Sequence, residues 1–309
     1  MSPTSLEVTV EGRQLKLSNM DKVLYPSVGF TKGQVIDYYT RVAPVLLPHL
    51  RRRALTLKRY PNGVDGHSFY EKNCPSHRPA WVETVAVWSE RNKADVNYCL
   101  ANDLPTLVWV ANLASLELHT SLSHADDIER PTMLVFDLDP GAPADMVQCA
   151  QVGLVLREML DDLGLACFPK TSGSKGLQLY APLNSPASYE GPDGTKLFAH
   201  AVARRIEADQ PRLVVSQMAK EVRKGKVFID WSQNDSAKTT VCVYSLRARE
   251  RPTVSTPLTW EEVETVAEKE DPGLVVFEAE DVLDRVSRHG DLFAPVAEME
   301  QSLPAPPET

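Results

Sequence analysis

The chain has 309 residues, 43% of them hydrophobic, and a formal net charge of −9. This length allows one large domain or two closely packed lobes around a core. No run of residues approaches the roughly 18 consecutive apolar residues of a membrane span. The first ten residues lack the basic flank and apolar core of a signal peptide. The five cysteines form no C-x-x-C pair, which argues against a zinc ribbon and a disulfide framework and favours a reduced, cytoplasmic setting.

The negative charge is concentrated towards the C-terminal end. Residues 1–60 carry ten Lys/Arg and four Asp/Glu, a net of +6, whereas residues 251–309 carry four and fourteen, a net of −10. Screening by salt limits the reach of a charge to about 8 Å, so a local basic patch decides whether a phosphate backbone is attracted. The net charge therefore does not exclude a nucleic-acid partner, although a solvated basic face explains the first segment as well.

The first part of the chain predicts a lobe of mixed α and β structure. Two alternating segments around Glu11-Gly12 are typical of a hairpin. Thr31 is positioned to cap the helix that follows it. In chain order, the expected elements are hairpin strands over 6–10 and 13–17, a helix over 34–47 with Pro44 near its end, strands over 54–61 and 82–88, and helical stretches over 103–117.

The second part predicts the order β-α-β-β-α-β, which is that of the ferredoxin-like split unit. In the usual strand order of that fold, the first and last strands are neighbours. The chain is therefore expected to be an α+β protein, with a flexible, acidic and proline-rich tail over 295–309. The expected elements are strands over 133–140, 165–170, 176–182 and 226–231, helices over 144–163 and 196–208, and an insert over 210–225; the expected domain is 1–294, with an N-terminal lobe to about 125 and a catalytic core over 126–294.

Three aspartates carry the main chemical signal. Asp137 and Asp139 are two residues apart in an apolar strand, so their side chains share a face, and Asp230 lies in an equally apolar segment. Carboxylates this close repel one another unless a cation lies between them, and oxygen ligands suit Mg²⁺ or Mn²⁺. Two such ions, about 3.5–4 Å apart, can bind the attacking and leaving oxygens of phosphoryl transfer. The pattern Asp-x-Asp is weak alone, since it also occurs in haloacid-dehalogenase-type phosphatases, in glycosyltransferases and at ordinary strand ends.

A loop of small residues, TSGSKG (171–176), lies between two expected strands. Backbone N–H groups of such a loop can converge on an anion, and Lys175 adds a positive charge. It is not a Walker A loop, because Gly176 follows the lysine. A hairpin with a solvated lysine explains the loop alone equally well. Its place in the predicted unit, facing the carboxylates, favours a triphosphate cradle.

Eight ordered motifs resemble the polymerase domain of bacterial ATP-dependent DNA ligase D, within the archaeo-eukaryotic primase superfamily. The resemblance covers roughly residues 15–293. Any one motif is modest evidence, and the eight in order are strong evidence. They are LSNMDKVLYP (17–26), FYEKN (69–73), WVETV (81–85), LELHT (116–120), LVFDLDPG (134–141), TSGSKGL (171–177), KVFIDWSQN (226–234) and YSLRARERPTVSTPL (244–258).

That resemblance implies a two-lobed primase-polymerase fold, in which a ferredoxin-like or RRM-like catalytic core packs on an N-terminal α/β lobe. It implies metal-dependent transfer of NTPs or dNTPs to a 3′-hydroxyl in gap filling or end joining, with ribonucleotides favoured. The implied partners are DNA with gaps or ends bearing a 5′-phosphate, an ATP-dependent DNA ligase and Ku, and the implied protein is a monomer at the bacterial nucleoid. The matched residues are Asp137, Asp139 and Asp230 for two Mn²⁺ or Mg²⁺ ions; Ser172, Lys175 and Arg247 for the triphosphate; His119 and Gln233 for the nucleotide pocket; Asn19, Lys22 and Lys32 for the 5′-phosphate; and Phe69 and Tyr70 for template bases.

Gln178 departs from the family pattern, which commonly has His in S-G-x-K-G-x-H. Glutamine donates a hydrogen bond but cannot carry positive charge, which bears on triphosphate binding and on nucleotide preference. The chain has no ligase motif of the K-x-D-G type and no phosphoesterase half, so it resembles the stand-alone form of the polymerase. Two other functions stay open: a non-catalytic DNA-end-binding module that recruits a ligase, and a phosphatase-like hydrolase with Asp137 as nucleophile, which Pro140-Gly141 after the Asp-x-Asp disfavours.

Overall fold

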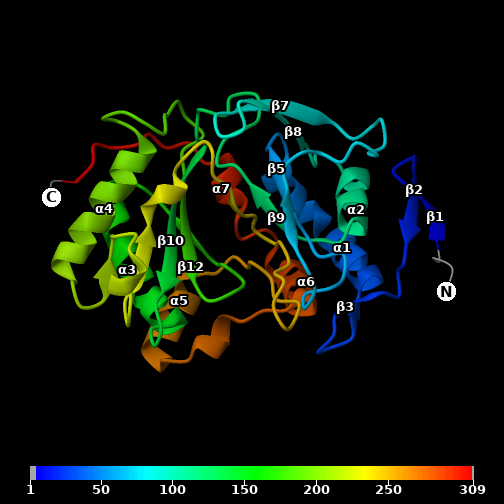
Figure 1. Ribbon diagram of the computed structural model, residues 1–309. Helices are drawn as coiled ribbons and strands as arrows, with labels where there is room; N and C mark the ends of the chain where they lie inside the picture. Colours follow the sequence, from blue (N-terminus) through cyan, green and yellow to red (C-terminus); the bar gives the residue numbers. More distant parts are fainter. Residues whose placement is uncertain (1–4, 308–309) are drawn as a thin grey trace. The chain divides into compact units, whose positions relative to one another are not determined.

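The computed structural model describes residues 5–307 and divides the chain into two compact units (Figure 1). The first unit contains the chain up to Ser121 together with Val241–Ser255 and Phe277–Asp291, and the remaining segments form the second unit. The mixed α+β class expected from the sequence is confirmed. The domain boundaries stay a prediction, since after residue 240 the chain passes several times from one unit to the other.

The first unit begins with the expected hairpin and the expected capped helix. Glu11 and Gly12 both have positive φ, as the tight turn between the first two strands requires. Thr31 accepts a hydrogen bond from the Gln34 amide and its own amide donates to the Gln34 side chain, which is a capping box. Its elements are β1 (Ser5–Val10), β2 (Arg13–Ser18), β3 (Val23–Tyr25), β4 (Phe30–Thr31), α1 (Lys32–Leu50), β5 (Leu55–Arg59), β6 (Phe69–Glu71), β7 (Thr84–Ser89), β8 (Ala94–Cys99), α2 (Leu104–Asn112), β9 (Ser115–Thr120) and α6 (Ala279–His289).

A sheet runs through this unit in the order β15-β9-β5-β8-β7, and β6 pairs with β5. β15 (Thr240–Val241) lies where the chain returns from the second unit to the first. The expectation of helix over 103–117 is wrong in its second half. The helix ends at Asn112, and Ser115–Thr120 is a strand buried on both faces. Because both faces are buried, this strand lacks the alternation of polar and apolar residues that identifies a half-exposed strand.

The second unit contains the predicted β-α-β-β-α-β order, and its sheet has the strand order β11-β12-β10-β14-β13 (Figure 1). β10 is central and antiparallel to both β12 and β14, so the first and last strands of the unit are neighbours, as expected. The insert supplies β13, which adds a parallel edge strand. The elements are β10 (Met133–Pro140), α3 (Met146–Asp162), β11 (Phe168–Thr171), β12 (Leu177–Pro182), α4 (Thr195–Asp209), β13 (Val214–Val215), β14 (Val227–Asp230), α5 (Trp260–Lys269), α7 (Ala294–Glu298), and the 3-10 turns η1 (Lys220–Val222), η2 (Trp231–Gln233) and η3 (Pro272–Val275).

One face of this sheet is apolar and packs against helices. Leu138 on β10 pairs with Leu177 on β12 and with Ile229 on β14, and all three are buried. Gly153 of α3 lies so close that a Cβ atom there would be 2.8 Å from the Leu177 side chain. Residues one position along each strand therefore point to the other face, which carries the polar side chains described below.

The tail expected to be flexible over 295–309 begins with the helix α7 and with hydrogen-bonded residues up to Gln301. Residues from α7 to Gln301 hydrogen-bond to the end of β12 and the residues around it. Asn184 donates to the carbonyls of Val296 and Met299, and the Gln301 side chain accepts from the Ala166 amide. Composition alone indicated disorder, but these specific backbone contacts order the segment.

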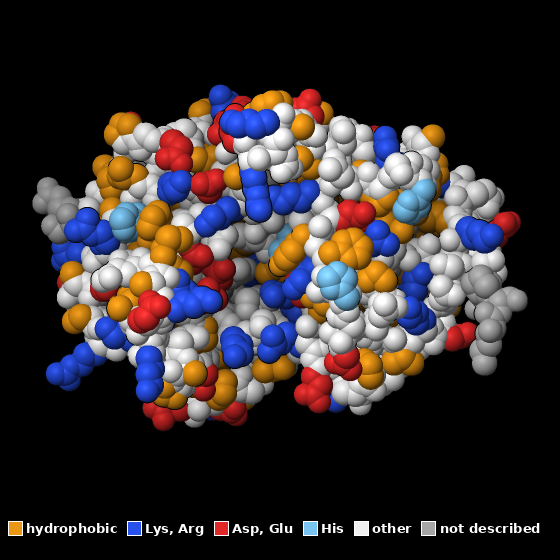
Figure 2. Space-filling view, viewed as in Figure 1, with side chains coloured by type: hydrophobic (Ala, Val, Ile, Leu, Met, Phe, Trp, Pro, Cys, Tyr) orange, Lys and Arg blue, Asp and Glu red, His pale blue; other side chains and the backbone are white. Residues whose placement is uncertain are grey.

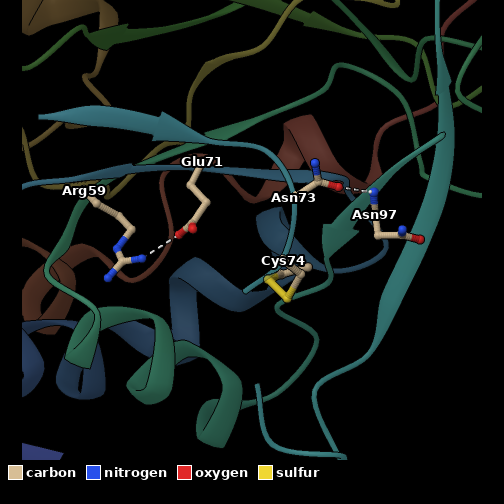
Figure 3. Close-up of a disulfide and its surroundings, with 6 residues drawn as sticks. Arg59, Glu71, Asn73, Cys74 and Asn97 are labelled. Atoms are coloured by element: carbon tan, nitrogen blue, oxygen red, sulfur yellow. Dashed lines mark hydrogen bonds and ion pairs between the residues drawn. A yellow bond between two sulfur atoms is a disulfide. The ribbon is translucent and has the colours of Figure 1, made fainter. Parts of the chain in front are cut away.

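A disulfide joins Cys74 and Cys99, which the sequence spacing argued against (Figure 3). The pairing depends on a fold that brings Cys74, three residues after the end of β6, next to Cys99 at the end of β8. Figure 3 shows that the Asn97 amide donates to the Asn73 side chain. The Cys74 amide also donates to the Asn97 carbonyl. Cys149, Cys167 and Cys242 are free and buried.

Within the described residues, no helix is both long and apolar enough to cross a membrane. The surface does not have a uniform charge. Figure 2 shows lysine and arginine side chains spread over the visible face of both units, among acidic and apolar side chains. The net negative charge of the chain therefore leaves room for local basic sites, as the sequence predicted.

Candidate active site

A row of four polar side chains crosses the sheet of the second unit. Lys170 on β11 pairs with Gln178 on β12, Gln178 pairs with Asp137 on β10, and Asp137 pairs with Asp230 on β14. Residues directly opposite one another in antiparallel strands share a face. Asp139, two residues after Asp137, shares it too. The structure thus brings the three predicted carboxylates together, on the face away from the helices.

Hydrogen bonds link this row. Lys170 Nζ donates to Gln178 Oε1 at 2.5 Å, and Gln178 Nε2 donates to Asp137 Oδ1 at 3.0 Å. Lys170 is 1% exposed, so this lysine is buried, and only Gln178 on the intervening strand separates it from Asp137. Burial, followed by the charge of Asp139, raises the pKa of Asp137 to about 7, against the opposing effects of Gln178 and Lys170. The site therefore holds more negative charge than its own cations neutralise.

The position and the chemistry of the three carboxylates suit a divalent cation, but the oxygens of Asp230 accept hydrogen bonds from neighbouring residues instead. The donors are all oxygen, which suits Mg²⁺ or Mn²⁺. Asp230, however, is turned into its own chain: its Oδ1 accepts from Ser232, and its Oδ2 accepts from Gln233 Nε2 at 2.8 Å. Among residues 5–307, no three His, Cys, Asp or Glu side chains converge closely enough to hold an ion as they stand. The hydrogen bonds from Ser232 and Gln233 therefore compete with a shared cation for the oxygens of Asp230.

Gln233 was predicted to line the nucleotide pocket, which stays a prediction. In the structure its side-chain amide donates to Asp230 Oδ2 and so contacts a predicted metal ligand. The turn that carries it is held by Asn234, whose side chain hydrogen-bonds to both the amide and the carbonyl of Val135 on β10. These bonds extend the pairing of β10 beyond the end of β14 and fix the turn after Asp230.

The small-residue loop lies directly beside β10. A Cβ atom on Gly176 would be 2.2 Å from the Leu138 carbonyl oxygen, so only glycine allows this approach. Ser172 Oγ accepts from the amides of Ser174 and Gly176, which shapes the loop, and Gly173 has a φ of +65°. Lys175 is exposed at the tip. The loop is therefore a compact turn with one exposed cation next to the carboxylates.

In the first unit, a second cluster forms around Glu117 on β9. His119 lies two residues along the same strand, and Lys58 lies opposite Glu117 on β5, so the three side chains share a face. Arg247 reaches the same carboxylate from the segment after residue 241. The structure thus joins two predicted nucleotide-binding residues, His119 and Arg247, through a carboxylate that the sequence analysis did not select.

The charge state of this cluster follows from its contacts. Burial alone would raise the pKa of Glu117, but the hydrogen bond from His119 and the charges of Arg247 and Lys58 outweigh it and lower the pKa to about 2. Burial lowers the pKa of His119 from its ordinary value, although Glu117 opposes this. Burial therefore favours the neutral form of His119, and the neighbouring cations favour the ionised form of Glu117.

Phe69 and Tyr70 do not form one aromatic platform. They are consecutive residues of β6, so their side chains point to opposite faces. Tyr70 lies against His119, with ring centroids 5.6 Å apart, and the Lys58 ammonium lies 5.2 Å from its ring centroid. On the other face, the Arg59 guanidinium lies 5.4 Å from the Phe69 ring centroid. Each aromatic ring is thus associated with a different group of residues.

A basic pocket of about 580 Å³ lies on the Arg59 side of this strand pair. Asn19, Lys22 and Lys32 line it, as the sequence predicted for a phosphate site, and Lys16 and Arg59 line it as well. Lys32 Nζ donates to the Ser18 carbonyl at 2.6 Å and to Ser18 Oγ at 3.2 Å. Burial, and then the charge of Lys22, lowers the pKa of Lys32 to about 8. Four basic residues line this one pocket, which suits a phosphate group.

Sequence reasoning missed four residues of these sites: Glu117, Lys58, Arg59 and Lys170. Lys58 and Arg59 were part of an expected strand, but nothing in the sequence shows that they point to different sites. Glu117 lay inside an expected helical stretch. Lys170 directly precedes the small-residue loop, and that position was the only signal available for it.

Comparison with known proteins agrees with this geometry. The family model for the LigD primase-polymerase domain matches residues 31–293. The multifunctional non-homologous end joining protein LigD of Mycolicibacterium smegmatis is 43% identical over 92% of this chain, and the bifunctional LigD of Bacillus subtilis is 33% identical over 91%. The chain spans 36% and 44% of these two relatives, respectively.

A solved structure is also similar. The polymerase domain from Mycobacterium tuberculosis ligase D in complex with DNA has a TM-score of 0.84 and 41% sequence identity to this chain. The match covers 93% of this chain and 99% of that one. The mixed α+β fold is that of the ligase D polymerase domain, and the chain therefore belongs to the family of LigD primase-polymerase domains, which are nucleotidyltransferases that use divalent metal ions.

Proposed function

We propose that this protein adds nucleotides from NTPs or dNTPs to a 3′-hydroxyl at gaps or broken ends of DNA, in non-homologous end joining. The observation that carries the proposal is the register of β10 and β14, which places Asp137 directly opposite Asp230 with Asp139 two residues along. The relatives support the repair context, since their names describe non-homologous end joining and the similar solved structure is a complex with DNA. The place of action is then the bacterial nucleoid.

In this proposal, Asp137, Asp139 and Asp230 hold two Mn²⁺ or Mg²⁺ ions. Bound there, the ions would neutralise the carboxylates and stabilise charge on the reacting phosphate. The chain itself orients the substrate: Ser172 shapes the loop, and Lys175 and Arg247 attract the triphosphate. Reaction forms one bond from the 3′-oxygen to the α-phosphorus, breaks the bond to the bridging oxygen and releases pyrophosphate.

The pocket of Asn19, Lys22 and Lys32 would hold the 5′-phosphate of the downstream strand, with Arg59 as an additional cation. His119 would contact the sugar of the incoming nucleotide. Tyr70 lies beside His119 and so is placed to contact that nucleotide or the base pair it forms. Phe69, on the opposite face, is the better candidate for stacking on a template base. An ATP-dependent ligase that seals the product, and Ku at the DNA end, are the proposed partners.

A gapped duplex with a downstream 5′-phosphate, labelled nucleotides and Mn²⁺ or Mg²⁺ tests the proposal. We expect primer extension with release of pyrophosphate, and loss of extension in Asp137→Ala with DNA binding retained. Binding without extension under all metal and nucleotide conditions would support a non-catalytic end binder instead. Release of inorganic phosphate would support a hydrolase instead.

A further inference from the structure

Glu117 is a carboxylate at the centre of the first unit, and its side chain is 2% exposed. A carboxylate buried to this extent requires paired charges or hydrogen bonds. Its neighbours supply them from β9, from β5 and the residue after it, and from the segment after residue 241. They are His119 Nε2 at 3.0 Å, the Ala248 amide at 3.1 Å, Tyr60 Oη at 3.4 Å, Arg247 Nε at 3.4 Å and Lys58 Nζ at 3.7 Å.

The contact with His119 determines which ring nitrogen carries the proton. An ionised carboxylate only accepts hydrogen bonds, so Nε2 of the neutral ring must be the donor. Nδ1 then carries a lone pair and is an acceptor. An acceptor at this position attracts a hydroxyl group and disfavours the oxygens of a phosphate, which are acceptors themselves. The same carboxylate holds the Arg247 guanidinium, which is suited to phosphate.

We propose that Glu117 is a positioning residue that fixes His119 in its Nε2–H tautomer and holds Arg247 beside it, so that the pair reads a hydroxyl-bearing sugar and a phosphate together. The proposal rests on the proposed function for the identity of its ligand, a nucleoside triphosphate. A 2′-deoxy sugar lacks the hydroxyl, which leaves the Nδ1 acceptor unpaired in the complex. Glu117 therefore acts on the choice between ribonucleotides and deoxyribonucleotides through His119, without touching either.

The first test is direct and needs no activity. Nuclear magnetic resonance of the full chain with isotope-labelled histidine reports the tautomer of each ring, and His119→Asn identifies the signal of His119 by its loss. We expect a neutral ring protonated at Nε2 near neutral pH. A ring protonated at Nδ1, or at both nitrogens, would overturn the proposal.

The second test measures binding of ATP and dATP by calorimetry, with single-nucleotide extension as a parallel readout. Glu117→Gln removes the negative charge and permits either tautomer, and we expect the ratio of ATP to dATP affinity to fall by about five-fold or more. Glu117→Asp keeps the charge and should retain part of the preference. The matched control is Glu71→Gln, since Glu71 pairs with Arg59 at 2.7 Å on the opposite face of the same sheet, and its ratio should not change (Figure 3).

Equal weakening of ATP and dATP binding in Glu117→Gln would show a merely structural role and would overturn the proposal. If Glu117→Gln does not fold, Glu117→Asp and the tautomer of the wild-type ring decide the question. Failure of the wild-type protein to bind either nucleotide would refute the proposed function. The tautomer measurement would then still show whether Glu117 fixes the ring.

Discussion

Replacing Asp137 by asparagine should stabilise the metal-free protein while abolishing nucleotide transfer. The substitution keeps the shape of the side chain and an oxygen that can accept from Gln178 Nε2. It removes one negative charge from a site where burial and two neighbouring carboxylates raise the pKa of Asp137 to about 7. An acid whose pKa is raised by folding loses stability as the pH rises from its unfolded pKa, about 3.8, through its folded pKa.

The size of the effect follows from that shift. A rise of about three pKa units corresponds to roughly 4 kcal/mol of folding free energy at a pH well above 7. This is an upper limit, because Asp137 keeps part of its surface in contact with solvent. A gain of about 1–4 kcal/mol should raise the melting temperature by a few degrees or more in a chain of this size.

Thermal unfolding in a chelator at about pH 5.5 and about pH 8.5 measures this effect, with the expected gap between variant and wild type widening at the higher pH. Added Mn²⁺ should stabilise the wild type and narrow the gap. The control is Asp235→Asn, since a salt bridge to Lys196 at 2.8 Å contributes to a lowered pKa of Asp235, and this loss of charge should destabilise. A variant Asp137→Asn that melts below the wild type in chelator at high pH would refute the reasoning.

Four further predictions concern other sites. Replacing Lys22 and Lys32 together by glutamine should weaken binding to a gap with a 5′-phosphate by about ten-fold or more relative to one with a hydroxyl; anisotropy measures both, and equal losses would contradict the pocket assignment. Because the pKa of Lys32 is about 8, wild-type affinity for the phosphorylated gap should fall as the pH rises through that value. Gln178→His should keep primer extension within a few-fold, because a neutral imidazole also offers one acceptor and one donor, whereas Gln178→Leu should reduce it about ten-fold; equal rates would exclude a role for the link. Cys74→Ser removes a crosslink across a sequence separation of 25 and should cost roughly 3 kcal/mol in oxidising buffer only, as seen by denaturant unfolding, and an unchanged midpoint there would argue against the disulfide.

The catalytic strand was predictable because its pattern is local. Residues 133–140 form an apolar run bounded by a proline-glycine turn, and the strand has those limits in the structure. The pairing of Asp137 with Asp230 was also expected, since the order of elements implied a known strand order. Such inferences succeed where a short segment and a standard topology together determine the neighbours.

Glu117 shows why the remainder was not predictable. Its importance comes from Lys58 and Arg247, which are distant in the sequence and are brought together by the pairing of β5 with β9 and by a segment that returns to the first unit. Gln178 is a different case. Its departure from the family's histidine was visible, but its role was not, because the orientation of its amide depends on the buried Lys170.

The alternation of side chains along β5 and β6 has a consequence for how this protein tolerates change. Lys58 and Tyr70 project to the side of Glu117, while Arg59 and Phe69 project to the side of the basic pocket. A point substitution at one position leaves the other side's chemistry in place. Inserting or deleting a single residue in one of these strands would turn both of its side chains to the opposite faces. A substitution should therefore damage one site, whereas a length change should damage both.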